Sequence, residues 1–369
     1  MAQGKVTVNN LNLGQGSSPE IERKALFIGI GPTNIGSVLS INTQSDLDDL
    51  LGAAASVIKT NVMAAKANGG ENWQAYVAPI DAGDDWEDAL DLALLTISPE
   101  LVCVCVPATA AADLTAAQTK AELVRTSFAR RIIILMATQG VDAETQDWAA
   151  YAAAQAALTT GVSGYRVAAV PQLHGNDLGV LAGRLCNRAA SIADSPMRVK
   201  TGPVLGLGAT PVDMDGKLLT DATLATLDAN RLSCIQHYTD YAGTFWGDCN
   251  LLDAAGGDYQ VIENLRVVDK AARSVRLIAI VKIADRTFND SPMSMASNAS
   301  DFARPLRQMS KSANVGGLVF PGDIRPPKDD SITIVWIDND SVEVYIKVQP
   351  WNSPKEITCN LILDLSSGS

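Results

Sequence analysis

The amino-acid sequence predicts a mixed α/β fold in two domains, and three patterns along its 369 residues support that prediction. From residue 25 to 205, apolar strand-like runs alternate with helical stretches, which favours a sheet with helices packed on its faces. The longest helical pattern follows at about 258–284, with apolar residues at alternating steps of four and three. Three runs of β character then follow, at 331–338, 341–350 and 356–365.

The first domain contains several expected elements in alternation. Its strand candidates are ALFIGI (25–30), AYVAPI (75–80), ELVCVCVP (100–107), RIIILMA (131–137) and YRVAAVP (165–171). Helical stretches lie between them, at 45–67, 85–96, 113–129 and 143–158. Beyond this domain, a helix that includes His237 is expected within 221–241, and a shorter one near 297–311.

Glycine and proline mark the expected domain boundaries. Residues 1–24 form an N-terminal arm and linker, in which GQGSSP is typical of a flexible connection. Residues 25–205 form the outer α/β domain, and 206–221 form a second linker, at the end of a segment from 196 to 221 that contains several glycines and prolines. Residues 222–369 form the second domain, whose C-terminal arm begins at about 353.

Composition excludes several classes of protein. Hydrophobic residues make up 47% and charged residues 19%, which predicts an ordered globular chain. The net charge of −12 argues against binding to nucleic acid, which requires basic surface. No run has the length of a signal peptide core or of a membrane span, so synthesis in the cytoplasm without membrane insertion is expected. The six cysteines include no CxxC pair and are expected to be buried thiols.

The stretch KALFIGIGPTNIGS, residues 24–37, invites comparison with a dinucleotide-binding turn. The fingerprint G-x-G-x-x-G fails because Asn34 replaces the third glycine, and Pro32 removes an N–H that could face phosphate. No acidic residue ends a second strand about twenty positions later. A strand that ends in a permissive turn is therefore the interpretation, and no cofactor is expected.

The two histidines offer weak support for catalysis. His174 lies close to Asp177 in PQLHGNDLG, which leaves open a hydrolase that uses this loop. A locally hydrogen-bonded loop histidine is the plainer interpretation. No nucleophile elbow or metal-binding motif is present, so neither catalytic nor metal-binding residues are expected.

Both ends of the chain carry strand-capable arms. In the N-terminal arm, Val6 and Val8 lie at even positions and Leu11 and Leu13 at odd ones. A strand with a bulge at residues 9–10 would place all four side chains on one face. In the C-terminal run the apolar positions alternate with polar ones, except at Ile362. These positions are Ile357, Cys359, Leu361 and Leu363.

Three passages, taken in order, resemble the sheath proteins of contractile phage tails, contractile bacteriocins and related injection systems. The first is NDLGVLAGRLCNRAASIADSP, with Ala182, Gly183 and Pro196 in the family's places. The last is the β-rich end with its short amphipathic strand. The middle passage, in which WGDCNLL departs from a WG-x-R-T pattern, matches at Gly243, Trp246, Gly247, Leu251, Arg266 and Asp269. The resemblance covers roughly 170–369 and the N-terminal arm.

The resemblance implies a structural subunit and not an enzyme. The N-terminal arm and 222–369 would form a discontinuous inner domain, with a small sheet completed by arm strands from neighbouring copies. The subunits would polymerise around an inner tail tube, meet baseplate and tail terminator proteins in the virion, and contract by rigid-body rearrangement. An unrecognised α/β enzyme and another virion tail component remain as alternatives.

A second hypothesis concerns the face that would meet the tube. Arg266, Lys270 and Arg273 recur at steps of four and three on the long helix, in an otherwise acidic chain. We expect this basic stripe to contact an acidic inner tube. A solvated face with local ion pairs is the alternative.

Overall fold

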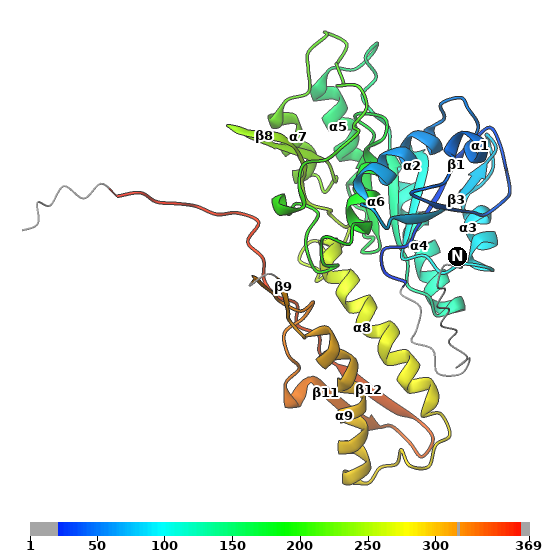
Figure 1. The fold of residues 1–369 in the computed structure, drawn as a ribbon, viewed down its shortest axis with the longest axis vertical. Coiled ribbons are helices and arrows are strands. Elements are labelled where there is room, and N and C mark those ends of the chain that lie inside the picture. Colours follow the sequence, from blue (N-terminus) through cyan, green and yellow to red (C-terminus); the bar gives the residue numbers. More distant parts are fainter. Residues whose placement is uncertain (1–20, 316–317, 363–369) are drawn as a thin grey trace, which may run out of the picture.

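The computed structural model describes residues 21–315 and 318–362 as two lobes that one long helix connects (Figure 1). The large lobe contains a six-stranded sheet in the order β2-β3-β1-β4-β5-β6. All neighbours in it are parallel except β2, which pairs antiparallel with β3. Its strands are β1 Ala25–Ile30, β2 Leu39–Asn42, β3 Gln74–Ile80, β4 Leu101–Ala108, β5 Ile133–Thr138 and β6 Val167–Pro171. The mixed α/β class is confirmed.

Helices cover both faces of this sheet, which explains why the strands are nearly continuous apolar runs. The chain crosses from β1 to β3 in one direction and from β3 to β5 in the other, so right-handed crossovers place α2 on one face and α3 and α4 on the other. The helices are α1 Leu47–Leu51, α2 Val57–Asn68, α3 Trp86–Leu94, α4 Ala111–Phe128, α5 Trp148–Thr159 and α6 Asp177–Cys186.

The glycines in β1 and in the turn after it are explained by close packing and by backbone conformation. A Cβ added at Gly29 would lie 2.7 Å from the Cys105 Cβ of the neighbouring strand. Gly36 has φ of +74°, a conformation that glycine adopts without strain. The interpretation of this stretch as a strand followed by a turn is confirmed.

Two further glycines allow α6 to pack closely on α2. A Cβ added at Gly179 would lie 2.0 Å from the Asn61 carbonyl oxygen, and one at Gly183 would lie 2.4 Å from that of Ala65. The Gly179 N–H also donates to Asn61 Oδ1 at 2.8 Å. Gly183 of the first family-like passage therefore lies where two helix backbones meet.

The expected boundary at residue 222 needs correction. Helix α7 (Asp221–Ala229) and the hairpin β7 (Ile235–Tyr238) and β8 (Tyr241–Trp246) pack on the large lobe. Leu227 and the fully buried Trp246 belong to the same core as the sheet. His237 lies in β7 and not in a helix, because the helix ends at Ala229, before the strand begins. The change of core comes later, within the long helix.

The small lobe is built on α8 (Ile262–Val281) and α9 (Pro292–Met309) (Figure 1). Ile262 and Leu265 at the start of α8 belong to the large core, whereas Val267 and Ala271 belong to a second core with Leu306. The hairpin of β11 (Ile332–Trp336) and β12 (Val342–Ile346) lies beside α9. The short strands β9 (Ala313–Val315) and β10 (Leu318–Phe320) form a further pair.

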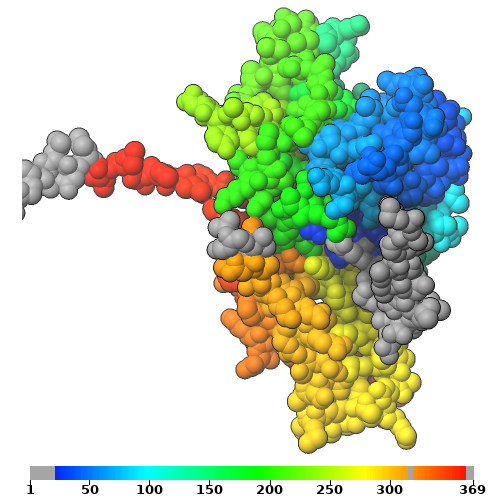
Figure 2. All heavy atoms as spheres, viewed as in Figure 1, coloured from blue at the N-terminus to red at the C-terminus, as the bar shows by residue number. Residues whose placement is uncertain are grey.

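The β run expected at 356–365 forms no strand within the described part of the subunit. Residues 351–362 run as an extended segment, and its part beyond Lys355 leaves the body. We call this part, residues 356–362, the C-terminal arm (Figure 2). Cys359 on this arm is exposed, whereas the other five cysteines are buried as expected. The N-terminal positions Val6, Val8, Leu11 and Leu13, and also Leu363, lie outside the described residues. No helix in the described ranges has both the length and the apolar character that crossing a bilayer requires.

Candidate assembly site

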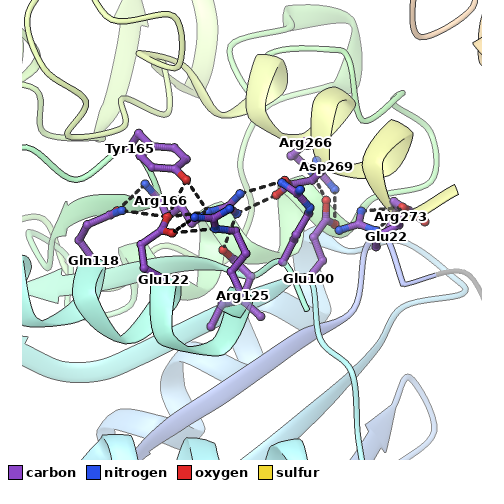
Figure 3. A network of polar contacts seen from close by, with 12 residues as sticks. Glu22, Glu100, Gln118, Glu122, Arg125, Tyr165, Arg166, Arg266, Asp269 and Arg273 are labelled. Atoms are coloured by element: carbon purple, nitrogen blue, oxygen red, sulfur yellow. Dashed lines mark hydrogen bonds and ion pairs between the residues drawn. The ribbon is translucent and has the colours of Figure 1, made fainter. Parts of the chain in front are cut away.

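Helix α8 joins the two lobes through a buried ion pair with the sheet (Figure 3). Arg266 donates from Nε and Nη2 to the two oxygens of Glu100, each at 2.8 Å. Both side chains are 2% exposed. Burial by itself would raise the pKa of Glu100, but Arg266, together with Arg273 and the Arg23 N–H, outweighs burial and holds that pKa below its usual value. Such a fork-shaped pair fixes the angle of the helix as well as its position.

A second buried pair lies nearly one turn further along α8. Asp269 accepts from Nη1 and Nη2 of Arg166 at 2.9 and 3.0 Å, and Arg131 donates to it at 3.2 Å. Arg166 directly precedes β6, the last strand of the sheet. The hydroxyl of its neighbour Tyr165 donates to Glu122 at 2.6 Å. The Arg and Asp of the middle family-like passage thus hold α8 against two strands of the large lobe.

The expected basic stripe on α8 is not a free surface. Arg266 is buried and paired with Glu100, so its assignment as a tube-facing residue is wrong for this subunit. Lys270 pairs with Asp323 at 2.6 Å and is 33% exposed. Arg273 pairs with Glu22 at 2.6 Å and is 14% exposed. Spacing along the helix identified one face, but that face meets carboxylates of the same chain.

The arm starts from a third cluster of charges. The Lys355 ammonium contacts Asp248 Oδ2 and lies 2.7 Å from Glu263 Oε1, near the start of α8. Asp248 Oδ1 also accepts from the Ser195 hydroxyl at 3.1 Å. Burial and then repulsion by Asp248 raise the pKa of Glu263 above its usual value. This cluster could not be predicted from the sequence, because its members are remote in the chain.

Beyond Lys355, the arm exposes apolar side chains. Ile357 is 74% exposed, Leu361 97% and Ile362 92%. Leaving such large side chains in water is unfavourable, by roughly 1.5–3 kcal/mol each relative to burial. An exposed extended segment also presents unpaired N–H and C=O groups that can pair with another strand.

The side chains of His174 and Asp177 stabilise the loop before α6 by local hydrogen bonds. Asp177 Oδ1 lies 2.8 Å from His174 Nδ1, and its Oδ2 accepts from the His174 backbone N–H at 2.6 Å. Both side chains are buried. The interpretation of His174 as a locally hydrogen-bonded histidine is confirmed.

Three solved structures share this two-lobed fold. The sheath tail protein Lin1278 of Listeria innocua has a TM-score of 0.58 at 10% identity, over 91% of this chain and 93% of that one. The sheath tail protein of Desulfitobacterium hafniense has 0.53 at 10%, over 94% and 96%. A chain of the anti-feeding prophage baseplate structure has 0.56 at 13%, over 98% and 100%. The fold is therefore that of the sheath tail proteins.

Sequence comparison places the chain within a family. Residues 3–250 match the family described as DUF2586, N-terminal domain, and residues 258–366 match DUF2586, C-terminal domain. A protein of Haemophilus phage HP1 (strain HP1c1), named "Putative tail sheath protein", is 45% identical over 372 residues and 98% of each chain. The chain belongs to this family of tail sheath proteins.

Proposed function

We propose that this protein is the structural subunit of a contractile tail sheath, and that its arms link neighbouring copies by strand exchange. The observation that supports the linkage is the arm itself, whose apolar residues Ile357 and Leu361 are exposed without a partner in the described subunit. One added strand contributes four to six backbone hydrogen bonds, each worth about 0.5–1.5 kcal/mol net. Many such links in a closed ring or stack hold far more strongly than one.

The strand to which the arm would be added belongs to the small lobe. In β11 and β12, half-buried residues alternate with exposed ones, as expected for a hairpin with one covered face. Each strand of a two-stranded sheet has one edge without a partner, and such edges accept extended peptides. We infer that the arm of one copy occupies an edge of this hairpin in the next copy.

The same architecture supports contraction by rigid-body rearrangement. The buried ion pairs hold the two lobes of one copy as a unit, whereas the arms are extended connectors. Copies can therefore rotate as rigid bodies while their arms stay paired, and no hydrolysis of a fuel is required. The assembled sheath would surround an inner tail tube, contact baseplate and tail terminator proteins, and form part of the virion after assembly in the host cytoplasm.

The proposal is tested by Leu361→Asp, which places a charge on the apolar side of the arm. Asn360→Asp introduces the same charge one position away, on the opposite side of the alternating run, and is the matched control. Negative-stain microscopy of the concentrated purified chain is expected to show ordered hollow cylinders for the control and monomers for Leu361→Asp. Equal polymerisation of both variants would refute strand exchange by the arm. A wild-type chain that never polymerises would refute the sheath function.

A further inference from the structure

The position of Lys355 explains where the C-terminal arm becomes independent of the body. Upstream, the chain is fixed to the small lobe: the Arg325 N–H donates to the Gln349 carbonyl at 2.8 Å, and Trp351 Nε1 donates to the Ile324 carbonyl at 3.0 Å. Downstream, Ile357 is 74% exposed, and Leu361 and Ile362 are almost fully exposed. Lys355 is thus the last described residue whose side chain is held by the body.

The segment between these anchors crosses hollow surface. Ser353, Pro354, Lys355 and Ile357 border an open hollow of about 780 Å³, which Arg198, Tyr238 and Tyr241 also line. Residues 350–353 border a second hollow of about 560 Å³ beside the start of α8. Because hollows flank the chain here, packing contributes little to its position. The ion pairs of Lys355 must therefore set its course.

The two carboxylates that bind the Lys355 ammonium belong to the large lobe. Asp248 follows β8 and Glu263 lies in the first turn of α8, so the two carboxylates come from different elements of the large lobe. Their side chains are 12% and 7% exposed. Glu263 Oε2 is buried without a hydrogen-bond partner among the described residues, so Lys355 is the main compensation for this carboxylate.

We propose that Lys355, Asp248 and Glu263 form a latch that sets the starting point and direction of the C-terminal arm. The latch makes Lys355 a positioning residue for the linkage between copies, and this inference rests on the proposed strand exchange. Without the latch, the arm starts at Trp351, four residues earlier. The longer free segment samples a larger volume, which lowers its effective concentration at the neighbouring copy.

The latch can be tested on the monomer with spin labels. Cys359 is the exposed cysteine of the described chain, and Ala225→Cys adds a second exposed site on α7. Pulsed electron–electron double resonance then measures the distribution of distances between the two spin labels. For a flexible chain this spread scales with the square root of length, so extending the free segment from four residues to eight broadens it about 1.4-fold.

Three variants are compared with the labelled parent. Lys355→Met keeps the length of the side chain and removes its charge. Lys355→Met combined with Glu263→Gln also avoids an unpaired buried carboxylate, which guards against loss of folding. Lys347→Met is the matched control, because Lys347 pairs only at the surface, with Asp330.

The expected result is a spread about 1.4-fold broader for both Lys355 variants, with the control unchanged. Polymer formation should also slow for the Lys355 variants while their thermal unfolding stays cooperative. An equally broad distribution in the parent, or no broadening in either Lys355 variant, would overturn the latch. This readout uses monomers, so it stands apart from failure of the wild-type chain to polymerise, which would refute strand exchange instead.

Discussion

At the scale of single residues, buried charges determine how the lobes are joined. Arg266 and Glu100 are separated by 166 positions, and Arg166 and Asp269 by 103, yet each pair meets in the interior. Removing one partner of such a pair leaves an uncompensated buried charge, which costs far more than losing a pair at the surface.

Replacement of Glu100 by glutamine should therefore be strongly destabilising. The neutral amide leaves the Arg266 guanidinium buried without a counter-charge, and we expect the free energy of unfolding to fall by about 3–5 kcal/mol. Urea unfolding measures the change. Asp330→Asn, which breaks the exposed pair with Lys347, is the control and should have no measurable effect. A loss in Glu100→Gln as small as in this control would contradict the role of the pair.

Glu263 should make stability depend on pH in the direction opposite to most carboxyl groups. Its pKa is raised in the folded state by burial and by Asp248, so the folded protein holds this proton at pH values where the unfolded chain has lost it. Stability relative to Glu263→Gln should then fall as pH rises from the ordinary glutamate pKa through the raised one. Urea unfolding at a series of pH values measures this difference. A relative stability that rises with pH would show that Lys355 dominates instead.

At the scale of elements, the contact of α6 with α2 depends on glycine. The Cβ of Gly183→Ala would meet the Ala65 carbonyl, which belongs to a helix backbone and has little freedom to move. Alanine gains up to about 1 kcal/mol in helix propensity. Overpacking costs about 1–3 kcal/mol and should outweigh it, so we expect a lower midpoint of thermal unfolding. An unchanged or higher midpoint would show that the helices can separate without cost.

Elements with strong local signals were predictable from the sequence. The strands β1, β3, β4, β5 and β6 are apolar runs between glycine, proline and polar residues, and their buried surroundings agree with that pattern. The apolar residues of α8 recur with a clear helical period, so the existence of this helix was predictable. Its observed start and end fall inside the expected range. The short strand β2 was missed, and β7 was taken as part of a helix, because short strands have little periodicity.

The partners of the charged residues could not be predicted in the same way. Arg266 and Arg273 lie on one face of α8, as expected, but helical period says nothing about which segment covers that face. Glu22 and Glu100 cover it from distant parts of the chain. Likewise, nothing near Lys355 in the sequence points to Asp248, because the fold alone brings the arm past β8.

At the scale of the whole molecule, the chain combines a rigid body with an extended connector. The ion pairs of α8 hold the two lobes, and the arm leaves the body with its apolar side chains in water (Figure 2). An exposed extended segment of this kind has unpaired backbone N–H and C=O groups, which supports the proposal that a second copy supplies the partner. The family of tail sheath proteins gives this arrangement its biological setting.

Hydrogen exchange at the C-terminal arm measures whether a neighbouring copy pairs with it. Backbone amides of residues 356–362 should exchange rapidly in the monomer, because they are exposed and lie outside any strand. If a neighbouring copy pairs with the arm, the same amides should become strongly protected when the chain polymerises. Polymers whose arm amides exchange as fast as those of the monomer would contradict strand exchange.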